Sequence, residues 1–358
     1  MKYNLQDEKI RVSGRTIFRD GIRFLGYSGT AVTFRFCGKR AEAVLVSDAS
    51  SWDENGQAWV AVFADGAVEP IKRFPLAKDE DTYVLYESEK EQDVVLTLMK
   101  YSEAEYATCG VKEIITDAKE LLKLPPLSDR KLLIIGDSIT CGYGVEGFVE
   151  DEEFETKHEN PMKAYSLRTA YDLQAQSQVV AWNGKGVISA YIGDEFDEVD
   201  DSWLIPMLYE YTDAGRERDY FHLPKEQWEK WDHTSYQADI VTVYLGTNDA
   251  SYTKEIPERN QMFCDAYVAF LERIHETQPH AAILCMLGNM DKRLCTTVEK
   301  AVSVFRKKHE DVLAEYLDLP MQLDEDGLGT FWHPTAITQE KTADRVVKKI
   351  REMMGWDA

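Results

Sequence analysis

The sequence contains no apolar run that approaches the roughly 20 residues needed to cross a bilayer. Its first eight residues also lack the apolar core of a secretory signal. We therefore expect a cytoplasmic protein that has no membrane partner.

Closely spaced cysteines are also absent. The six cysteines lie at positions 37, 109, 141, 264, 285 and 295, and none forms a Cys-x-x-Cys pair. No group of His and Cys residues has the spacing of a zinc site. Cys37, Cys264 and Cys285 lie in apolar runs, which favours reduced, buried thiols. We expect neither a metal nor another cofactor.

Basic residues are outnumbered. The chain carries 41 Lys and Arg against 64 Asp and Glu, which gives a net charge of -23. This balance disfavours nucleic acid and anionic membrane surfaces as partners. It suits a soluble protein that acts on a neutral or cationic small substrate. The length of 358 residues suggests two domains, at roughly 100–200 residues per domain.

Residues 1–118 have the pattern of an all-β domain. Short apolar runs lie at residues 30–37, 41–46, 58–63, 68–71, 83–86, 94–98 and 111–115. Asp65-Gly66 separates two of the runs and predicts a hairpin whose second strand begins at Val68. Many short strands at close spacing indicate a β-sandwich. Residues 119–130 include Pro125-Pro126 and are interpreted as a linker.

Residues 131–358 alternate between strand and helix patterns. Strands are predicted at residues 132–135, 179–182, 240–245, 281–287 and 312–317. Helices fall between them, one of which is expected to begin at Asn160-Pro161. This alternation predicts a parallel sheet covered on both faces, that is, an α/β fold. An aromatic-rich insertion at about residues 186–237 interrupts it.

The stretch around Ser138 stands out. The apolar run 132–135 stops at Gly136, and Ser138 follows just past the expected strand end. Open α/β sheets bind their ligands at this edge. We interpret Ser138 as a nucleophile, against the alternative of an ordinary Asp-Ser turn.

Other residues suited to acyl transfer fall at comparable places. Gly184 and Asn248 follow the second and third predicted strands, and His333 precedes the last helix. A serine can attack a carbonyl while a histidine takes its proton. Backbone N–H groups and an amide side chain can bind the developing oxyanion. Each residue alone is explained as well by a structural role, but the four together favour catalysis.

These motifs resemble those of a known family. Gly136-Asp137-Ser138-Ile139-Thr140, the Gly184 turn, Gly246-Thr247-Asn248-Asp249 and His333-Pro334 look like the conserved blocks of the SGNH (GDSL-type) hydrolases. The whole chain is more similar still to carbohydrate esterase family 2, the acetyl-xylan-esterase-like deacetylases. The resemblance implies a small N-terminal jelly-roll sandwich before a three-layer α/β/α SGNH domain.

The resemblance also implies roles. Ser138 would be the nucleophile and His333 the general base. The backbone N–H groups of Ser138 and Gly184 and the amide of Asn248 would form the oxyanion hole, with Gly186 as a competitor for the Gly184 role. The activity implied is that of a carboxylic ester hydrolase that removes O-acetyl groups from plant-polysaccharide oligosaccharides of the xylan or mannan type, without metal or cofactor.

One position departs from the family pattern. SGNH enzymes usually carry an Asp three residues before the catalytic His, and here that residue is Thr330. We favour a Ser-His dyad in which a backbone carbonyl holds His333. The alternative is that Asp324 or Asp326 folds back to it. The Thr330 side chain itself is expected to matter little.

The remaining candidates have narrower roles. Asp137 and Asp249 are expected to hold loop backbone, and Cys141 to be a packing residue. Trp332 is the best candidate to wall the acyl pocket, and Trp231 of the insertion is a candidate for stacking on a sugar ring. Two other functions stay open, a lipase or thioesterase acting on other acyl esters, and a carbohydrate-binding protein whose catalytic machinery has decayed. The sequence does not give the sugar, the acetyl position or the oligomeric state.

Overall fold

The computed structural model describes residues 1–151, 153–193 and 195–357, and these form two compact units. The first unit comprises Met1–Leu127, Phe154–Glu159 and Thr212–Glu229. The second comprises Ser128–Glu153, Asn160–Tyr211 and Lys230–Ala358. Among the described helices none is both long and apolar enough to cross a membrane.

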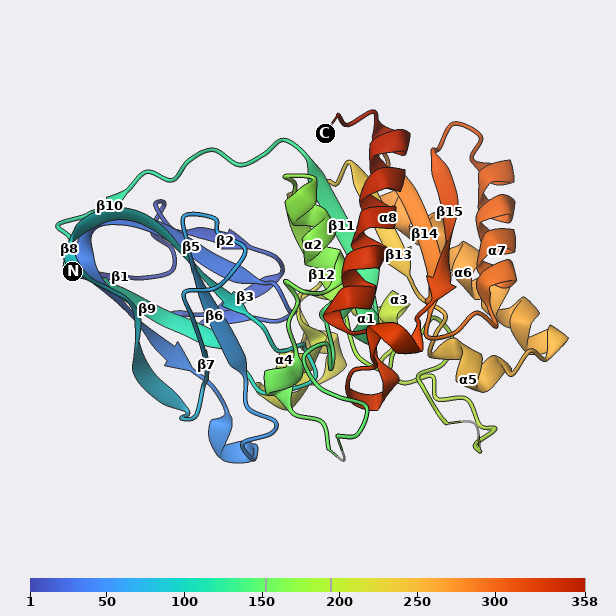
Figure 1. Cartoon of the computed structure of the whole chain (residues 1–358), viewed down its shortest axis with the longest axis horizontal. Coiled ribbons are helices and arrows are strands. Elements are labelled where there is room, and N and C mark those ends of the chain that lie inside the picture. The colour runs from blue at the N-terminus through green and yellow to red at the C-terminus, as the bar shows by residue number, and fades with distance from the viewer. Residues whose placement is uncertain (152, 194, 358) are drawn as a thin grey trace. The chain divides into compact units, whose positions relative to one another are not determined.

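The first unit is built on one antiparallel sheet (Figure 1). Its strands are β1 (Lys2–Tyr3), β2 (Arg11–Ser13), β3 (Thr16–Arg19), β4 (Ile22–Leu25), β5 (Ala31–Val46), β6 (Trp59–Ala64), β7 (Lys72–Pro75), β8 (Glu80–Lys100), β9 (Gly110–Thr116) and β10 (Leu121–Leu122). The main order is β3-β4-β9-β5-β8-β6-β7, with β1, β2 and β10 pairing off this path. The predicted all-β N-terminal region is confirmed.

Two long strands replace four of the predicted short ones. β5 includes both runs 30–37 and 41–46, and its register against β8 shifts between Gly38 and Arg40. Such an irregularity bends a strand. The first half of β5 pairs with β2 and β10, whereas the second half pairs with β9. One bent strand therefore pairs with different partners along its length.

The hairpin at Asp65-Gly66 is present but longer than predicted. Both residues have positive φ, 53° and 74°, which turns the chain. The second strand, β7, begins at Lys72 rather than at Val68, and pairs with β6 through Val62 and Lys72.

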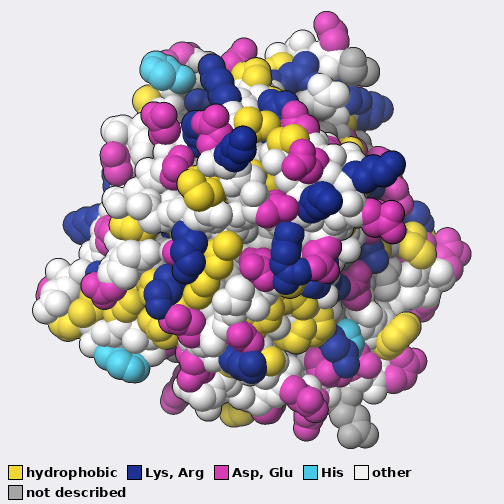
Figure 2. Space-filling model, turned by 90° about the vertical axis from the view of Figure 1, so that its left-hand side faces the viewer, with side chains coloured by type: hydrophobic (Ala, Val, Ile, Leu, Met, Phe, Trp, Pro, Cys, Tyr) yellow, Lys and Arg dark blue, Asp and Glu magenta, His cyan; other side chains and the backbone are white. Residues whose placement is uncertain are grey.

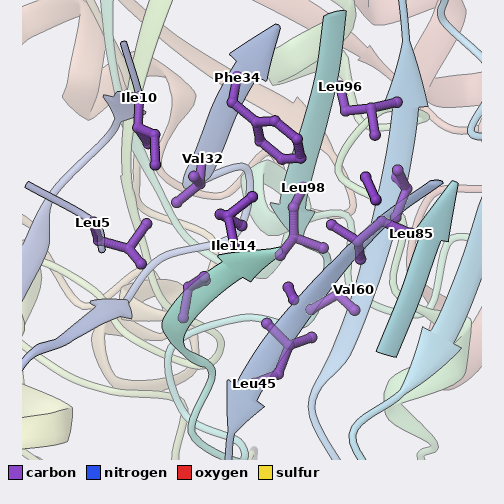
Figure 3. Packing of buried hydrophobic residues seen from close by; sticks show 14 of the residues in the cluster. Leu5, Ile10, Val32, Phe34, Leu45, Val60, Leu85, Leu96, Leu98 and Ile114 are labelled. Atoms are coloured by element: carbon purple, nitrogen blue, oxygen red, sulfur yellow. The ribbon is translucent and has the colours of Figure 1, made fainter. Parts of the chain in front are cut away.

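Side chains from several strands form the core of the first unit. Leu45 of β5, Val60 of β6, and Leu85 and Leu98 of β8 are fully or almost fully buried and point toward one another (Figure 3). Within residues 32–36 and 41–45 of β5 and 94–98 of β8, every second residue belongs to this core, as the pleat requires. Cys37 corrects the expectation of buried thiols, because it lies on the exposed side of β5. The other five cysteines are buried, and none of the six, all of which lie in the described part of the chain, forms a disulfide.

The first unit also takes in segments from the second half of the chain. Arg216, in α4 (Ala214–Asp219), is 1% exposed. Its guanidinium donates to Thr108 Oγ1 at 2.7 Å and to the carbonyls of Ala104 and Tyr106 at 2.7 and 2.9 Å. A buried charge needs such partners. Part of the aromatic-rich insertion therefore packs onto the all-β unit.

Both signs of charge are present on the surface seen in Figure 2, where basic and acidic side chains are interspersed. No broad basic patch occupies that face.

The second unit contains a five-stranded parallel sheet. Its strands are β11 (Lys131–Gly136), β12 (Gln176–Ala181), β13 (Ile240–Tyr244), β14 (Ala282–Asn289) and β15 (Ala314–Met321), in the order β12-β11-β13-β14-β15. β13 and β14 are buried along their whole length, which explains their nearly continuous apolar sequences. The predicted parallel sheet is confirmed.

Helices cover this sheet on both faces (Figure 1). The α-helices outside the first unit are α1 (Ser138–Cys141), α2 (Tyr165–Asp172), α3 (Ile205–Leu208), α5 (Asp249–Thr253), α6 (Pro257–Thr277), α7 (Cys295–Lys308) and α8 (Ala336–Met354). α2 packs with α8, and α6 with α7. The three-layer α/β/α prediction is confirmed.

One predicted helix start is wrong. Asn160-Pro161 forms a turn, in which Asn160 Oδ1 accepts from the N–H groups of Met162 and Lys163, and α2 begins only at Tyr165. The Asn side chain satisfies the turn backbone and so does not cap the helix.

The strand order fixes where a site can form. The chain passes from β11 to β12 on one side and then crosses to β13 on the other side of β11. Such a reversal leaves a crevice at the carboxyl ends of the strands. Ser138 follows β11 and Asn248 follows β13 at this edge.

Candidate active site

Ser138 is the first residue of α1, directly after the turn that ends β11. The carboxylate of Asp137 accepts a hydrogen bond from the N–H of Ile139 at 3.1 Å and so caps the helix. Gly136 is required here, because a Cβ would lie 2.0 Å from Thr140 Oγ1. The turn presents Ser138 at the sheet edge, where its side chain is 4% exposed.

His333 contacts Ser138. The two side chains lie 2.8 Å apart, measured from His333 Nε2 to Ser138 Oγ. On the other side of the ring, Nδ1 lies 3.0 Å from the carbonyl oxygen of Thr330. A carbonyl oxygen can only accept, so Nδ1 carries the proton and Nε2 accepts from the serine hydroxyl. This is the tautomer that a general base needs.

The imidazole of His333 is enclosed. His333 is 8% exposed, and its ring centroid lies 4.6 Å from that of Tyr143. Burial lowers the pKa of His333 to about 4, although the nearby carbonyls of Thr330 and Phe331 oppose the shift. The ring is therefore neutral near pH 7 and able to accept a proton.

The structure shows which group orients the His333 ring, a backbone carbonyl or the carboxylate of Asp324 or Asp326. Its Nδ1 is held by the Thr330 carbonyl, as the dyad hypothesis predicted. Asp326 instead binds Lys341, whose Nζ lies 2.6 and 2.7 Å from the two carboxylate oxygens. No hydrogen bond joins His333 to Asp324 or Asp326 in the described chain.

Gly184 and Gly186 differ in their surroundings. Gly184 has φ +70°, and a Cβ added there would meet nothing within 4 Å. A Cβ at Gly186 would lie 2.4 Å from Asp249 Oδ2 and 2.3 Å from the Ser189 carbonyl oxygen. Gly186 is thus needed for packing, whereas Gly184 borders open space, where an oxyanion donor would have to lie.

Asn248 lies where β13 leads into α5, and it is 7% exposed. Its Nδ2 donates to the Lys185 carbonyl at 3.0 Å and lies 3.3 Å from Asp137 Oδ2. The amide therefore connects the turn that carries Ser138 with the loop that carries Gly184. These contacts hold it at the same edge of the sheet as Ser138.

The two buried aspartates support loops, as predicted. Asp249 accepts from the N–H groups of Val187, Ile188 and Ser189. Burial raises the pKa of Asp137 to about 7 and that of Asp249 to about 6, with hydrogen bonds from backbone N–H groups acting in the opposite direction. Cys141 is fully buried, in keeping with a packing role.

The tryptophan candidates lie in different places. Trp332 precedes His333 and is 59% exposed. Trp231 donates its backbone N–H to the Glu210 carbonyl, and Glu210 pairs with Arg273 near the end of α6. That end of α6 leads into the start of β14, at the amino edge of the sheet. The structure therefore does not bring Trp231 to Ser138 and His333.

Sequence reasoning missed several residues that hold the site together. Gln339 of α8 accepts from the N–H of Tyr165 and donates to the Ile139 carbonyl, which joins α8 to the turn that carries Ser138. The Thr330 hydroxyl donates to Asp151. These contacts have no local sequence signal. Gln339 is 174 positions from Tyr165 and 200 from Ile139, and Thr330 is 179 positions from Asp151. Within the described residues, no cluster of three or more His, Cys, Asp or Glu side chains is arranged to hold a metal ion.

Comparison with known families agrees with this architecture. Residues 134–341 match the model of the GDSL-like lipase/acylhydrolase family, more than half of the chain. Residues 12–126 match the carbohydrate esterase 2 N-terminal model. The chain belongs to the GDSL-like family, in the two-part form of family 2 carbohydrate esterases. It is thus a member of a family of carboxylic ester hydrolases.

Two characterised relatives are similar along most of the chain. The cellulase/esterase CelE of Acetivibrio thermocellus is 28% identical over 334 residues, which is 92% of this chain but only 38% of the relative. An acetylxylan esterase/glucomannan deacetylase of Cellvibrio japonicus is 27% identical over 356 residues, 98% of this chain and 90% of the relative. The chain thus spans well under half of the first relative and most of the second.

Solved structures share the fold. A family two carbohydrate esterase from Clostridium thermocellum, determined in complex with cellohexaose, has a TM-score of 0.83 at 28% identity and covers 97% of this chain and 100% of its own. An acetyl xylan esterase from the rumen bacterium Butyrivibrio proteoclasticus has a TM-score of 0.88 at 23% identity and full coverage of both chains, which bears on the fold alone.

Proposed function

We propose that this chain is a serine esterase that removes O-acetyl groups from oligosaccharides of plant polysaccharides. The observation that carries the proposal is the contact of 2.8 Å between Ser138 Oγ and His333 Nε2 at the carboxyl edge of the sheet. The names of the relatives, an acetylxylan esterase/glucomannan deacetylase among them, support acetylated xylan or mannan as the substrate class.

The reaction begins with Ser138. Its hydroxyl oxygen attacks the acetyl carbonyl while His333 Nε2 takes the hydroxyl proton. The bond between the acyl carbon and the sugar oxygen then breaks, and the sugar leaves with the proton from His333. A water molecule, deprotonated by His333, attacks the acetyl-serine ester, releases acetate and restores the free hydroxyl.

Three donors are proposed for the oxyanion that forms in each half of the reaction. They are the N–H of Ser138, the N–H of Gly184 and the side-chain amide of Asn248. The open space at Gly184 and the near-burial of Asn248 support this assignment. Donors fixed before reaction stabilise the developing charge. One N–H of Asn248 exchanges its 3.3 Å contact with Asp137 Oδ2 for the oxyanion, while the other keeps its contact with the Lys185 carbonyl.

A small acyl group fits the enclosed dyad. Ser138 is 4% and His333 8% exposed, so a reacting carbonyl must enter a confined site. Trp332, 59% exposed beside His333, is proposed to wall the acyl pocket or to contact the sugar. Trp231 has no place in the proposed site, because it lies toward the amino edge of the sheet.

The deciding experiment measures acetate release from acetylated xylo- and manno-oligosaccharides, with Ser138→Ala as the matched control. Butyrate and octanoate esters are tested in parallel. We expect serine-dependent acetate release and a preference for the short acyl chain.

Two results would contradict the proposal. Activity only on long acyl chains would assign a lipase or thioesterase function instead. Oligosaccharide binding without turnover, equal in wild type and Ser138→Ala, would assign a binding protein.

A further inference from the structure

The segment that supports His333 is itself anchored by a more distant carboxylate. Thr330 is fully buried, and its side-chain Oγ1 donates to Asp151 Oδ2 at 2.9 Å. The same carboxylate oxygen accepts from the N–H of Phe148 at 2.8 Å. Thr330 therefore binds His333 with its carbonyl and Asp151 with its hydroxyl.

The segment around Thr330 needs such anchoring. Phe331 and Trp332 have φ values of 51° and 61°, in the left-handed region that non-glycine residues rarely adopt. Such conformations persist only where surrounding contacts impose them. In this case the Thr330 carbonyl, just before the two residues, is the group that must be aimed at His333.

Contacts from the loop after the nucleophile supply the constraint. The Thr330 N–H donates to the Gly144 carbonyl at 3.1 Å, and the Val149 N–H donates to the Leu328 carbonyl at 3.1 Å. A Cβ at Gly144 would lie 2.9 Å from Thr330 Cβ, so the two backbones are in close contact. Asp151 adds a side-chain hydrogen bond that fixes the rotation of Thr330.

We propose that Asp151 is a positioning residue that acts on His333 through Thr330. The carboxylate that the SGNH pattern has three residues before the histidine is absent here. The chain instead uses the carbonyl of residue 330 toward the ring and a carboxylate one hydrogen bond further away. This inference rests on the proposed catalytic roles of Ser138 and His333, and it revises the expectation that the Thr330 side chain matters little.

The other ionisable groups near the ring do not supply this support. Asp137 is directed at Asn248 and at its own helix, and Asp326 is paired with Lys341. Tyr143 packs its ring on the imidazole. Within the described part of the chain, Asp151 is thus a carboxylate connected to His333 Nδ1 through a single residue, Thr330.

The test uses the whole chain and a fluorophosphonate probe, which reports how reactive Ser138 is without any sugar substrate. Ser138 Oγ bonds to phosphorus, fluoride leaves, and His333 takes the hydroxyl proton. Labelling rates and, in parallel, kcat and KM for acetate release are compared for Asp151→Ala, Asp151→Asn, Thr330→Val and Thr330→Ser. Asp326→Ala is the matched control. It removes a carboxylate that lies in the same segment as Thr330 but does not contact His333.

We expect Asp151→Ala and Thr330→Val each to label and turn over about tenfold more slowly, with KM unchanged, since one hydrogen bond that orients the base is lost. Asp151→Asn keeps an acceptor oxygen and Thr330→Ser keeps a donor hydroxyl. Their labelling rates and kcat should therefore stay within about threefold of wild type. The double variant Asp151→Ala/Thr330→Val should be no slower than either single one. Asp326→Ala should match wild type.

Several results would overturn the inference. These are wild-type labelling by folded Asp151→Ala, equal losses in Asp151→Asn and Asp151→Ala, or losses that multiply in the double variant. Failure of the proposed function looks different, because wild type would then label at Ser138 yet release no acetate. Circular dichroism shows whether each variant is folded, and Thr330→Ser against Thr330→Val keeps the test decisive if Asp151→Ala does not fold.

Discussion

The Nδ1 atom of His333 lies 3.0 Å from the carbonyl oxygen of Thr330, the residue at which the SGNH pattern has an aspartate. A carbonyl orients the ring and selects its tautomer, as a carboxylate does, but it brings no full negative charge to stabilise an imidazolium. The imidazole that we propose as the general base is thus positioned by backbone. Its efficiency depends on how firmly the segment of Thr330 is held.

The first prediction concerns the dyad. Ser138→Ala and His333→Ala should each remove nearly all turnover, because one lacks the nucleophile and the other the proton acceptor. The double variant should be no slower than the single ones, since the two side chains act as a unit. Acetate release by purified, folded variants is the measurement. Substantial turnover in His333→Ala would contradict the mechanism.

Asn248→Ala tests the oxyanion hole. Loss of one such donor should lower kcat by roughly 100- to 1,000-fold with little change in KM. Asn289 is a matched control, because it is a buried asparagine at the end of the neighbouring strand β14, and its Nδ2 donates to Thr342 Oγ1 at 3.0 Å. Asn289→Ala should cost stability but leave kcat per folded molecule unchanged. Normal turnover in Asn248→Ala would remove that residue from the oxyanion hole.

The glycine turn gives a second matched pair. Gly186→Ala puts a Cβ 2.4 Å from the Asp249 carboxylate, so we expect it to lower the free energy of unfolding by about 3 kcal/mol. Gly184→Ala meets no neighbour and should cost about 1–2 kcal/mol for its positive φ. Its kcat should nevertheless fall, because the strained backbone carries the proposed oxyanion donor. Urea unfolding and kcat separate the two effects, and the reverse order of stabilities would show that the loop packs differently.

Local pattern was enough to predict how the residues of the candidate site come together. The apolar runs predict the buried strands directly. Ser138, Gly184 and Asn248 follow the ends of three strands that pair in parallel. Parallel strands bring such ends to one edge whatever the intervening sequence does. The position of His333 could be expected for the same reason, since it precedes the helix that packs back on the sheet.

What the sequence did not reveal depends on contacts between distant residues. The bend of β5 depends on which strands pair with each half. The exposure of Cys37, in contrast, follows from a local alternation that the prediction overlooked, because Phe34 and Phe36 face inward and Arg35 and Cys37 face the other side of β5. The Thr330–Asp151 hydrogen bond joins residues 179 positions apart. The sequence predicts a single aromatic insertion at about residues 186–237. In the structure Thr212–Glu229 belongs to the first unit, whereas Trp231 belongs to the second. Its aromatic residues gave no sign of that division.

The enclosure of His333 also predicts how turnover depends on pH. Burial lowers the pKa of His333 to about 4, so kcat/KM should stay level from neutral pH down to about pH 5 and fall by half near pH 4. Protonation of Nε2 removes the acceptor for the serine proton, which sets the sign of the change. An inflection near the ordinary histidine value of about 6.5 would contradict the enclosed geometry.

Stability should respond over a related range but with opposing contributions. Between about pH 6.5 and 4 the unfolded chain binds a proton at His333 that the folded chain does not, so this group destabilises the fold as pH falls. Asp137, with its pKa raised to about 7, acts oppositely, because the folded chain keeps a proton that the unfolded chain releases above about pH 4. His333→Gln should therefore weaken the acid destabilisation between pH 6.5 and 4, measured by urea unfolding at each pH. An unchanged pH dependence of the unfolding free energy would mean that His333 titrates alike in both states, and the acid limit of kcat/KM would then belong to another group.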